Sequence, residues 1–108
     1  MKRGDLVSIA VQGDFGKPRQ ALVIQSDNFA SHATVTVLLV TGALVDAPLF
    51  RVAVQPTPDN GLQKPSQIMV DKVMTVKRDK IGGAFGRLDP GQMLEIERCL
   101  AVFLGIAK

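Results

Sequence analysis

Three polar residues stand where a β-prone run of the sequence meets a loop, and their side chains suit chemistry on a phosphate. Arg19 directly precedes an apolar run, so its guanidinium would be held near a rigid element and offers a forked donor to a phosphate. Thr41 ends the most β-prone run of the chain, and Gly42 beside it lets a ligand backbone approach closely. Asp71 interrupts another apolar run, where a carboxylate needs either solvent or a partner.

Each of these residues also has an ordinary structural interpretation. Long cationic side chains are mostly exposed, so Arg19 could be a surface arginine of a loop. Thr41 could be only the β-branched end of a strand, and Asp71 could pair with a neighbouring cation. The residues alone leave these alternatives open.

The remaining nucleophiles and bases exclude several reaction classes. A single histidine, His32, rules out a mechanism that needs two imidazoles, and its turn-rich surroundings predict an exposed loop residue. The single cysteine, Cys99, cannot form an internal disulfide and most resembles a small core side chain of a helix. The sequence has no Cys/His cluster that would hold zinc and no G-x-S-x-G elbow, so acyl-transfer hydrolysis is not expected.

Common nucleotide-binding signatures are missing as well. Gly82, Gly83 and Gly86 lie close together, but no G-x-x-x-x-G-K-[ST] sequence surrounds them. The chain has no Trp or Tyr, and its 5 Phe residues are scattered, which removes the aromatic platform on which many RNA-binding modules stack bases. Any nucleic-acid binding must therefore depend on cations, hydroxyls and backbone groups.

Length and charge indicate one small domain with a mild preference for polyanions. The 108 residues are enough for one core and too few for two, so we expect a single domain over residues 1–108. The net charge of +3 and the pI of about 9.4 favour a polyanionic partner. The N-terminal run lacks the apolar stretch of a signal peptide, and no segment reaches the roughly 20 apolar residues of a membrane span, which predicts a cytoplasmic protein.

The sequence pattern predicts about five or six short strands and then one helix. Asp89 can cap the helix, Pro90 suits its first position and Gln92 completes a capping box. Short strands punctuated by Gly and Pro, with no alternating helices, predict a mainly β fold: a small half-open barrel closed on one side by the helix. The strands are expected at residues 6–11, 20–25, 34–40, 50–55, 67–76 and 84–88, and the helix repeats apolar residues at Met93, Ile96, Leu100 and Phe103.

The order of several short motifs resembles the MazF/PemK/Kid toxin family. Residues 3–7 read RGDLV, residues 18–24 read PRQALVI after a Gly-containing loop, and residues 37–41 read VLLVT. The resemblance extends over nearly the whole chain through Gly61-Leu62, the run ending in Val70-Asp71, Gly86-Arg87-Leu88 and the final helix. Each motif is loose alone, and their order makes the match fairly specific.

The resemblance implies an SH3-like barrel, as in MazF and CcdB, and a homodimer. It also implies a type II toxin that cuts single-stranded RNA in a sequence-specific way (an mRNA interferase), by attack of a ribose 2′-hydroxyl on the adjacent phosphate. No metal or cofactor is implied. A cognate antitoxin is the implied protein partner, with an acidic, disordered tail that enters the RNA groove.

The resemblance also implies roles for the polar residues. Arg19 would stabilise the developing phosphorane charge and could protonate the leaving oxygen, while Thr41 would hydrogen-bond the phosphate. Asp71 would be the base or would orient the attacking hydroxyl. The substrate-binding candidates are Lys17, Gly42 and Gln67.

Two positions depart from the Kid-like pattern. Gln20 stands where the family often has Pro after the Arg, and Met69 replaces an arginine two residues before the acidic position. That arginine is a candidate catalytic acid in Kid-like members. Arg19 would therefore carry the charge-stabilising role alone.

Two other functions stay open on the sequence. A CcdB-like inhibitor of DNA gyrase would use the same barrel, but that branch relies on a Trp close to its C-terminus, and residues 102–108 contain none. A non-catalytic SH3-like module that binds nucleic acid or peptide would share the fold without any chemistry. The RNA motif depends on the loops at residues 12–18 and 42–66, whose geometry the sequence does not give.

Overall fold

Six strands and one helix make up the part of the chain described by the computed structural model, residues 1–10 and 17–108. The turns η1 (Asp27–Phe29) and η2 (Arg78–Lys80) connect β2 to β3 and β5 to β6. The strands are β1 (Asp5–Ala10), β2 (Pro18–Val23), β3 (Thr34–Thr41), β4 (Arg51–Val54), β5 (Ser66–Lys77) and β6 (Ile81–Arg87), and the helix is α1 (Pro90–Phe103).

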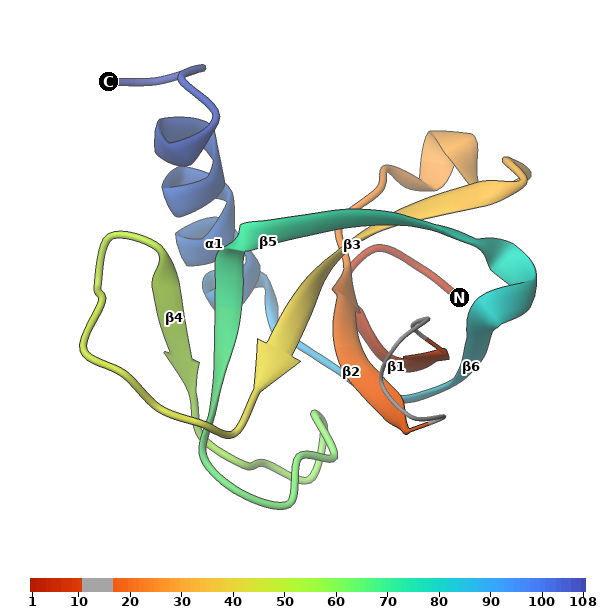
Figure 1. Cartoon of the computed structure of the whole chain (residues 1–108), viewed down its shortest axis with the longest axis horizontal. Helices are drawn as coiled ribbons and strands as arrows, with labels where there is room; N and C mark the ends of the chain where they lie inside the picture. The colour runs from red at the N-terminus through yellow and green to blue at the C-terminus, as the bar shows by residue number, and fades with distance from the viewer. Residues whose placement is uncertain (11–16) are drawn as a thin grey trace.

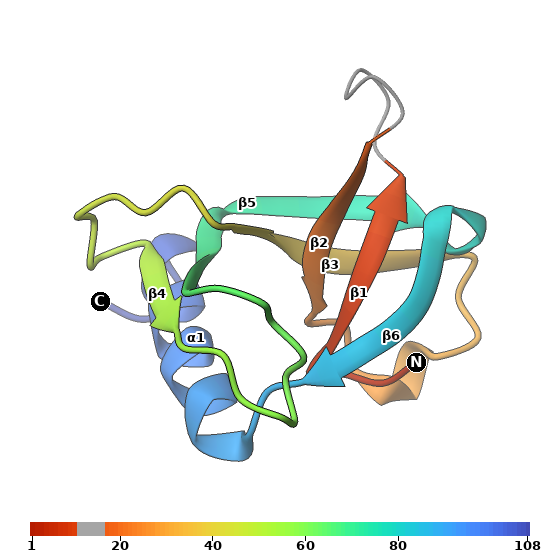
Figure 2. The ribbon, with the colours of Figure 1, turned by 90° about the horizontal axis from the view of Figure 1, so that it is seen from below.

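The strands form one antiparallel sheet in the order β4-β5-β3-β2-β1-β6, and β5 bends so that this sheet curls into a half-open barrel. Leu38 pairs with Val73 and Val40 pairs with Ile68, so residues 69–72 of β5 stand opposite the single residue Leu39 of β3 and form a bulge in this ladder. Bulges bend the strand that carries them, and β5 turns sharply along its length in Figure 1. The bend places η2 and β6 next to β1 (Figure 2). The observed fold confirms the expected mainly β barrel with a C-terminal helix.

Alternating side chains divide the apolar residues between two cores, one on each face of the sheet. The first core lies under α1, which packs against β5. The second core fills the barrel on the other face. The first contains Leu6, Leu22, Leu38, Val40, Val52, Val54, Leu62, Ile68, Val70, Leu88, Met93 and Ile96, and the second contains Val7, Ile9, Ala21, Val23, Val35, Val37, Leu39, Met69 and Val76.

The helix begins with the capping box that the sequence predicts. Asp89 Oδ1 accepts a hydrogen bond from the backbone N of Gln92 at 2.8 Å, and Gln92 Oε1 accepts one from the backbone N of Asp89 at 3.2 Å. Met93 and Ile96 are buried in the first core. Phe103, the last residue of the apolar repeat, is 49% exposed at the end of the helix, so only the earlier part of the repeat is covered by the sheet.

Two observed strands begin two or more residues earlier than expected. The ladder between β1 and β2 continues to the pair Ala10–Pro18, and a proline at the first position of a strand costs no ladder hydrogen bond inside it. Arg19 therefore lies within β2, not ahead of it as predicted. β6 begins at Ile81, because pairing with Ile9 of β1 holds a glycine-rich segment that has little strand propensity. The expected end of the first strand at residue 11 and most of the loop at 12–18 lie outside the described residues.

Candidate active site

Arg19 and Thr41 lie on neighbouring strands at the same end of the sheet. Gln20 of β2 pairs with Val40 of β3, and Arg19 and Thr41 are each the next residue toward that end of the antiparallel ladder. Thr41 in turn pairs with Gln67 of β5. We call Arg19, Thr41 and Gln67 the polar row; it crosses β2, β3 and β5.

The polar row faces away from α1. Arg19 pairs with Ile9, a residue of the second core, and the two side chains of a directly opposed pair lie on the same face of a sheet. Met69, two residues after Gln67, also belongs to the second core. All three residues of the row are half-buried. The row therefore lies at the end of the second core, on the face of the sheet that the helix leaves uncovered.

Gln67 and Arg51 fasten the chain just after Thr41. Gln67 Nε2 donates to the Val45 carbonyl at 2.8 Å, and Gln67 Oε1 accepts from the backbone N of Val45 at 3.2 Å and from Arg51 Nη1 at 3.0 Å. Arg51 Nη1 also donates to the Ala43 carbonyl at 3.4 Å. The backbone N of Ala43 donates to Thr41 Oγ1 at 3.1 Å, so these bonds also orient the Thr41 hydroxyl.

Sequence reasoning missed Arg51. It is the first residue of β4, in which buried valines alternate with less buried residues, and it pairs with Met69 of β5. The Arg51 guanidinium therefore comes from the strand next to Met69, the residue that replaces the arginine of Kid-like toxins. The Nε atom of Arg51 is buried and has no hydrogen-bond partner in the described part of the chain. Nothing in the sequence indicated the bond between Arg51 and Gln67.

Asp71 lies in the bulge of β5, outside the polar row. Its Oδ2 is 3.7 Å from Lys72 Nζ, and the side chain is 23% exposed. Its Oδ1 is buried and has no hydrogen-bond donor among the described residues. Asp71 thus lies beside a cation, Lys72, as the ordinary structural interpretation predicted. Its buried Oδ1 keeps no hydrogen-bond donor among the described residues, and an unsatisfied buried polar group costs about 1–3 kcal/mol.

Lys64 occupies the space beside Gly42. A Cβ atom on Gly42 would overlap Cε of Lys64 and would lie 2.7 Å from its Nζ. Lys64 comes from the connection between β4 and β5, and the sequence did not single it out. Lys17, the remaining substrate-binding candidate, is exposed directly before β2.

The other reactive residues belong to other parts of the fold: His32 lies just before the start of β3, and Cys99 lies on α1. His32 is exposed beside Phe29, as expected, with the two rings edge to face at 5.4 Å. Cys99 is half-buried on α1 and packs against the first core. Over residues 1–10 and 17–108, no group of three His, Cys, Asp or Glu residues could hold a metal ion. Over the same residues, no helix is long and apolar enough to cross a membrane.

The fold and the site together define a class of protein. It is a small half-open barrel that carries a guanidinium, a hydroxyl and an amide in a row on the face opposite its helix. The family model for the PemK-like, MazF-like toxins of type II toxin–antitoxin systems matches residues 2–104. The chain belongs to this family of toxins.

A curated relative agrees with this assignment, and two solved structures share the fold. The probable endoribonuclease MazF of Mycolicibacterium smegmatis is 46% identical over 108 residues, which are 99% of this chain and 99% of the relative. A mycobacterial endoribonuclease in complex with its cognate antitoxin has the same fold, with a TM-score of 0.83 at 23% identity over 100% of this chain and 98% of that one. The toxin MazF-mt6 of Mycobacterium tuberculosis gives a TM-score of 0.82 at 20% identity, covering 96% and 99% of the two chains.

Proposed function

We propose that this toxin is an endoribonuclease that cuts single-stranded RNA at the polar row without a metal ion. The 2′-hydroxyl before the cut gives its proton to a base and attacks the adjacent phosphorus. The bond from phosphorus to the 5′-oxygen breaks, and the 5′-oxygen takes a proton from Arg19 or from solvent, which leaves a cyclic phosphate and a 5′-hydroxyl. The observation that carries the proposal is the position of Arg19 and Thr41 on adjacent strands at one end of the ladder. The name of the 46% identical relative, a probable endoribonuclease, supports it.

Arg19 and Thr41 act on the phosphate. The Arg19 guanidinium donates to the phosphoryl oxygens as negative charge builds up in the phosphorane. Thr41 Oγ1 accepts a hydrogen bond from Ala43, so the hydroxyl proton is left to donate to a phosphate oxygen. A preorganised donor of this kind is typically worth about 10²–10³ in kcat.

Asp71 is the proposed base. Its Oδ1 is buried, so Oδ2 of this partly exposed side chain is the oxygen that accepts the proton of the attacking hydroxyl. Positioned proton transfer contributes about 10²–10⁴ in rate. Lys17 and Gly42 are next to the residues that contact the phosphate in this proposal. Gln67 holds the loop after Thr41 through its bonds to Val45.

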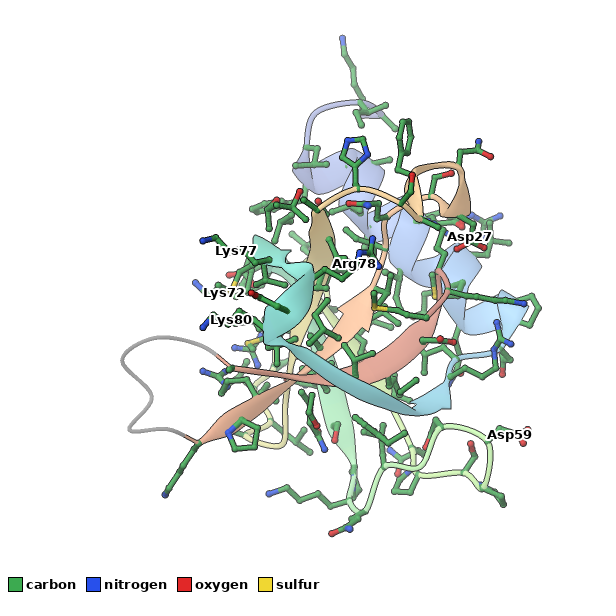
Figure 3. The ribbon with its side chains drawn as sticks, turned by 90° about the vertical axis from the view of Figure 1, so that its right-hand side faces the viewer. Asp27, Asp59, Lys72, Lys77, Arg78 and Lys80 are labelled. Carbon is green, nitrogen blue, oxygen red and sulfur yellow. The ribbon has the colours of Figure 1, made fainter. Side chains whose placement is uncertain are left out.

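The surface charge supports an RNA substrate. Figure 3 shows Lys72, Lys77 and Lys80 projecting on the same side of the molecule, with Arg78 in the turn between β5 and β6. β6 begins directly after this turn, and only β1 separates β6 from the strand that carries Arg19. Cations at this place favour a long polyanion that continues past the site.

The proposal includes a partner, an assembly and a location. The mycobacterial endoribonuclease with the same fold is bound to its cognate antitoxin, and we infer a cognate antitoxin here as well. We also infer a homodimer and action in the cytoplasm, where an RNA substrate is found. The family match over residues 2–104 supports one toxin domain across residues 1–108.

Cleavage of a long single-stranded RNA in excess EDTA tests the proposal. Wild-type protein is expected to give discrete cuts with 5′-hydroxyl ends. Arg19→Ala, Thr41→Ala and Asp71→Asn are each expected to cut about 100-fold more slowly or worse. Thr34→Ala is the matched control, because Thr34 is half-buried at the opposite end of β3 from Thr41. Intact RNA with the wild-type protein contradicts the proposal and returns weight to gyrase inhibition or passive binding.

A further inference from the structure

We propose that Lys64 is a second cationic contact of the site and binds the RNA phosphate next to the one that is cut. The inference rests on the proposed RNA cleavage and adds a substrate-binding residue to it. It follows from three observations: the position of the Lys64 ammonium, the hydrogen bond that holds the Lys64 backbone, and the absence of an arginine at position 69.

The side chain of Lys64 lies along the backbone directly after Thr41. A Cβ atom on Gly42 would overlap Lys64 Cε and would lie 2.7 Å from Nζ, so the ammonium is beside Gly42. No carboxylate in the described part of the chain is within ion-pair distance of this ammonium. The charge is therefore available to an anion that reaches the Thr41 hydroxyl.

The backbone of Lys64 is held in place by a buried residue. Ser66 is 3% exposed, and its hydroxyl donates to the Lys64 carbonyl at 2.9 Å. Ser66 also pairs with Val54 of β4, which fixes it in the sheet. The ammonium is thus presented from an anchored position, although the end of the side chain can still adjust to a ligand.

Asn60 orders the rest of the connection that carries Lys64. The Asn60 backbone lies against Gly86 of β6, where a Cβ atom would overlap it, and the backbone N of Arg87 donates to the Asp59 carbonyl at 2.9 Å. The connection between β4 and β5 is therefore docked on β6 at one end and held by Ser66 at the other. Preorganisation of this kind lowers the entropy lost when an anion binds.

The site lacks the arginine that Kid-like toxins carry at the position of Met69. Met69 is 6% exposed in the second core, and Arg51 beside it uses Nη1 to hold Gln67 and Ala43. Neither residue offers a mobile cation to the substrate. Lys64 approaches the row from a different segment and brings a positive charge to the Thr41 end.

RNA binding is measured first with a cleavage-resistant 2′-O-methyl oligonucleotide that contains the mapped cutting site. Lys64→Ala is expected to weaken the Kd by about tenfold and to reduce the slope of log K against log salt by about 0.7, the value for one phosphate contact on a single strand. Lys64→Arg is expected to retain most of the affinity. Lys2→Ala is the control. Lys2 is exposed and precedes the start of β1, whereas Ile9, which pairs with Arg19, lies near the other end of that strand.

Cleavage kinetics then separate binding from chemistry. For Lys64→Ala we expect a KM about tenfold higher with kcat changed less than about twofold, the pattern of a contact made equally in the ground and transition states. Gly42→Ala is expected to displace the Lys64 side chain and to raise KM as well. The double variant Gly42→Ala/Lys64→Ala should then be no weaker than the weaker single variant, because both changes remove the same contact.

Three outcomes would overturn the inference. The first is an unchanged Kd and salt slope for Lys64→Ala, and the second is a loss in kcat with KM unaltered. The third is a full additive loss in the double variant. If the wild-type protein cuts RNA and any of these holds, only the role of Lys64 fails; if the wild-type protein neither binds nor cuts RNA, the proposed function fails with it.

Discussion

Gln67 of β5 lies directly opposite Thr41 of β3, and its amide holds both backbone groups of Val45 in the loop that Thr41 begins. The same loop donates a hydrogen bond from Ala43 back to Thr41 Oγ1. The direction of the Thr41 hydroxyl therefore depends on a side chain from another strand. The geometry of the site therefore depends on both the pairing of the strands and the loop after Thr41.

Replacing Gln67 with Ala should loosen this loop. We expect kcat/KM to fall about tenfold or more, because three hydrogen bonds to Oε1 and Nε2 are lost and the Thr41 hydroxyl is no longer oriented. Hydrogen exchange should become faster at Val45, whose backbone N loses its acceptor. Gln63→Ala is the control, since Gln63 is exposed in the β4–β5 connection. Unchanged exchange at Val45 would show that the loop does not need Gln67.

Restoring the family arginine should not help. Met69 is 6% exposed in the second core, so Met69→Arg would bury a charge among apolar side chains. We expect the free energy of unfolding to fall by about 3 kcal/mol or more, with no gain in cleavage, whereas Met69→Leu should cost less than about 1.5 kcal/mol. Urea unfolding and RNA cleavage measure the two effects. A stable Met69→Arg protein with faster cleavage would mean that residue 69 can reach the substrate.

Asn60 should be the most sensitive polar residue for stability. It is fully buried; Nδ2 donates to the Gln55 carbonyl at 2.8 Å, and Oδ1 accepts from the backbone N of Thr57 and of Leu62, each at 3.0 Å. Asn60→Ala leaves these backbone groups without partners, so we expect a loss of about 2–4 kcal/mol by urea unfolding. Asp59→Ala, at an exposed neighbour, should cost less than about 0.5 kcal/mol. Equal losses in the two variants would contradict this account of the connection.

The sequence predicted the elements because their signals are local. The run from Thr34 to Val40 is rich in β-branched and apolar residues, and Asp89, Pro90 and Gln92 form a capping box within one turn. The strand boundaries were less accurate where pairing, not propensity, decides them. Arg19 lies inside β2 because β1 continues to pair with that segment.

The site was only partly predictable, because its remaining members meet through the fold. Thr41 and Gln67 were selected separately, and only the register of β3 and β5 shows that they are opposite each other. The bond from Arg51 to Gln67 and the position of Lys64 beside Gly42 both depend on how loops return to the sheet. No local pattern encodes such contacts.

The central claim, attack by a ribose 2′-hydroxyl at the polar row, is tested most directly with an RNA oligonucleotide that carries a single 2′-deoxy nucleotide directly before the mapped cut. In excess EDTA, the wild-type protein is expected to cut the all-ribose oligonucleotide and to leave the 2′-deoxy version intact, while both bind with similar Kd. Cleavage of the 2′-deoxy oligonucleotide at the same phosphate would contradict the account, because that substrate has no 2′-hydroxyl to attack.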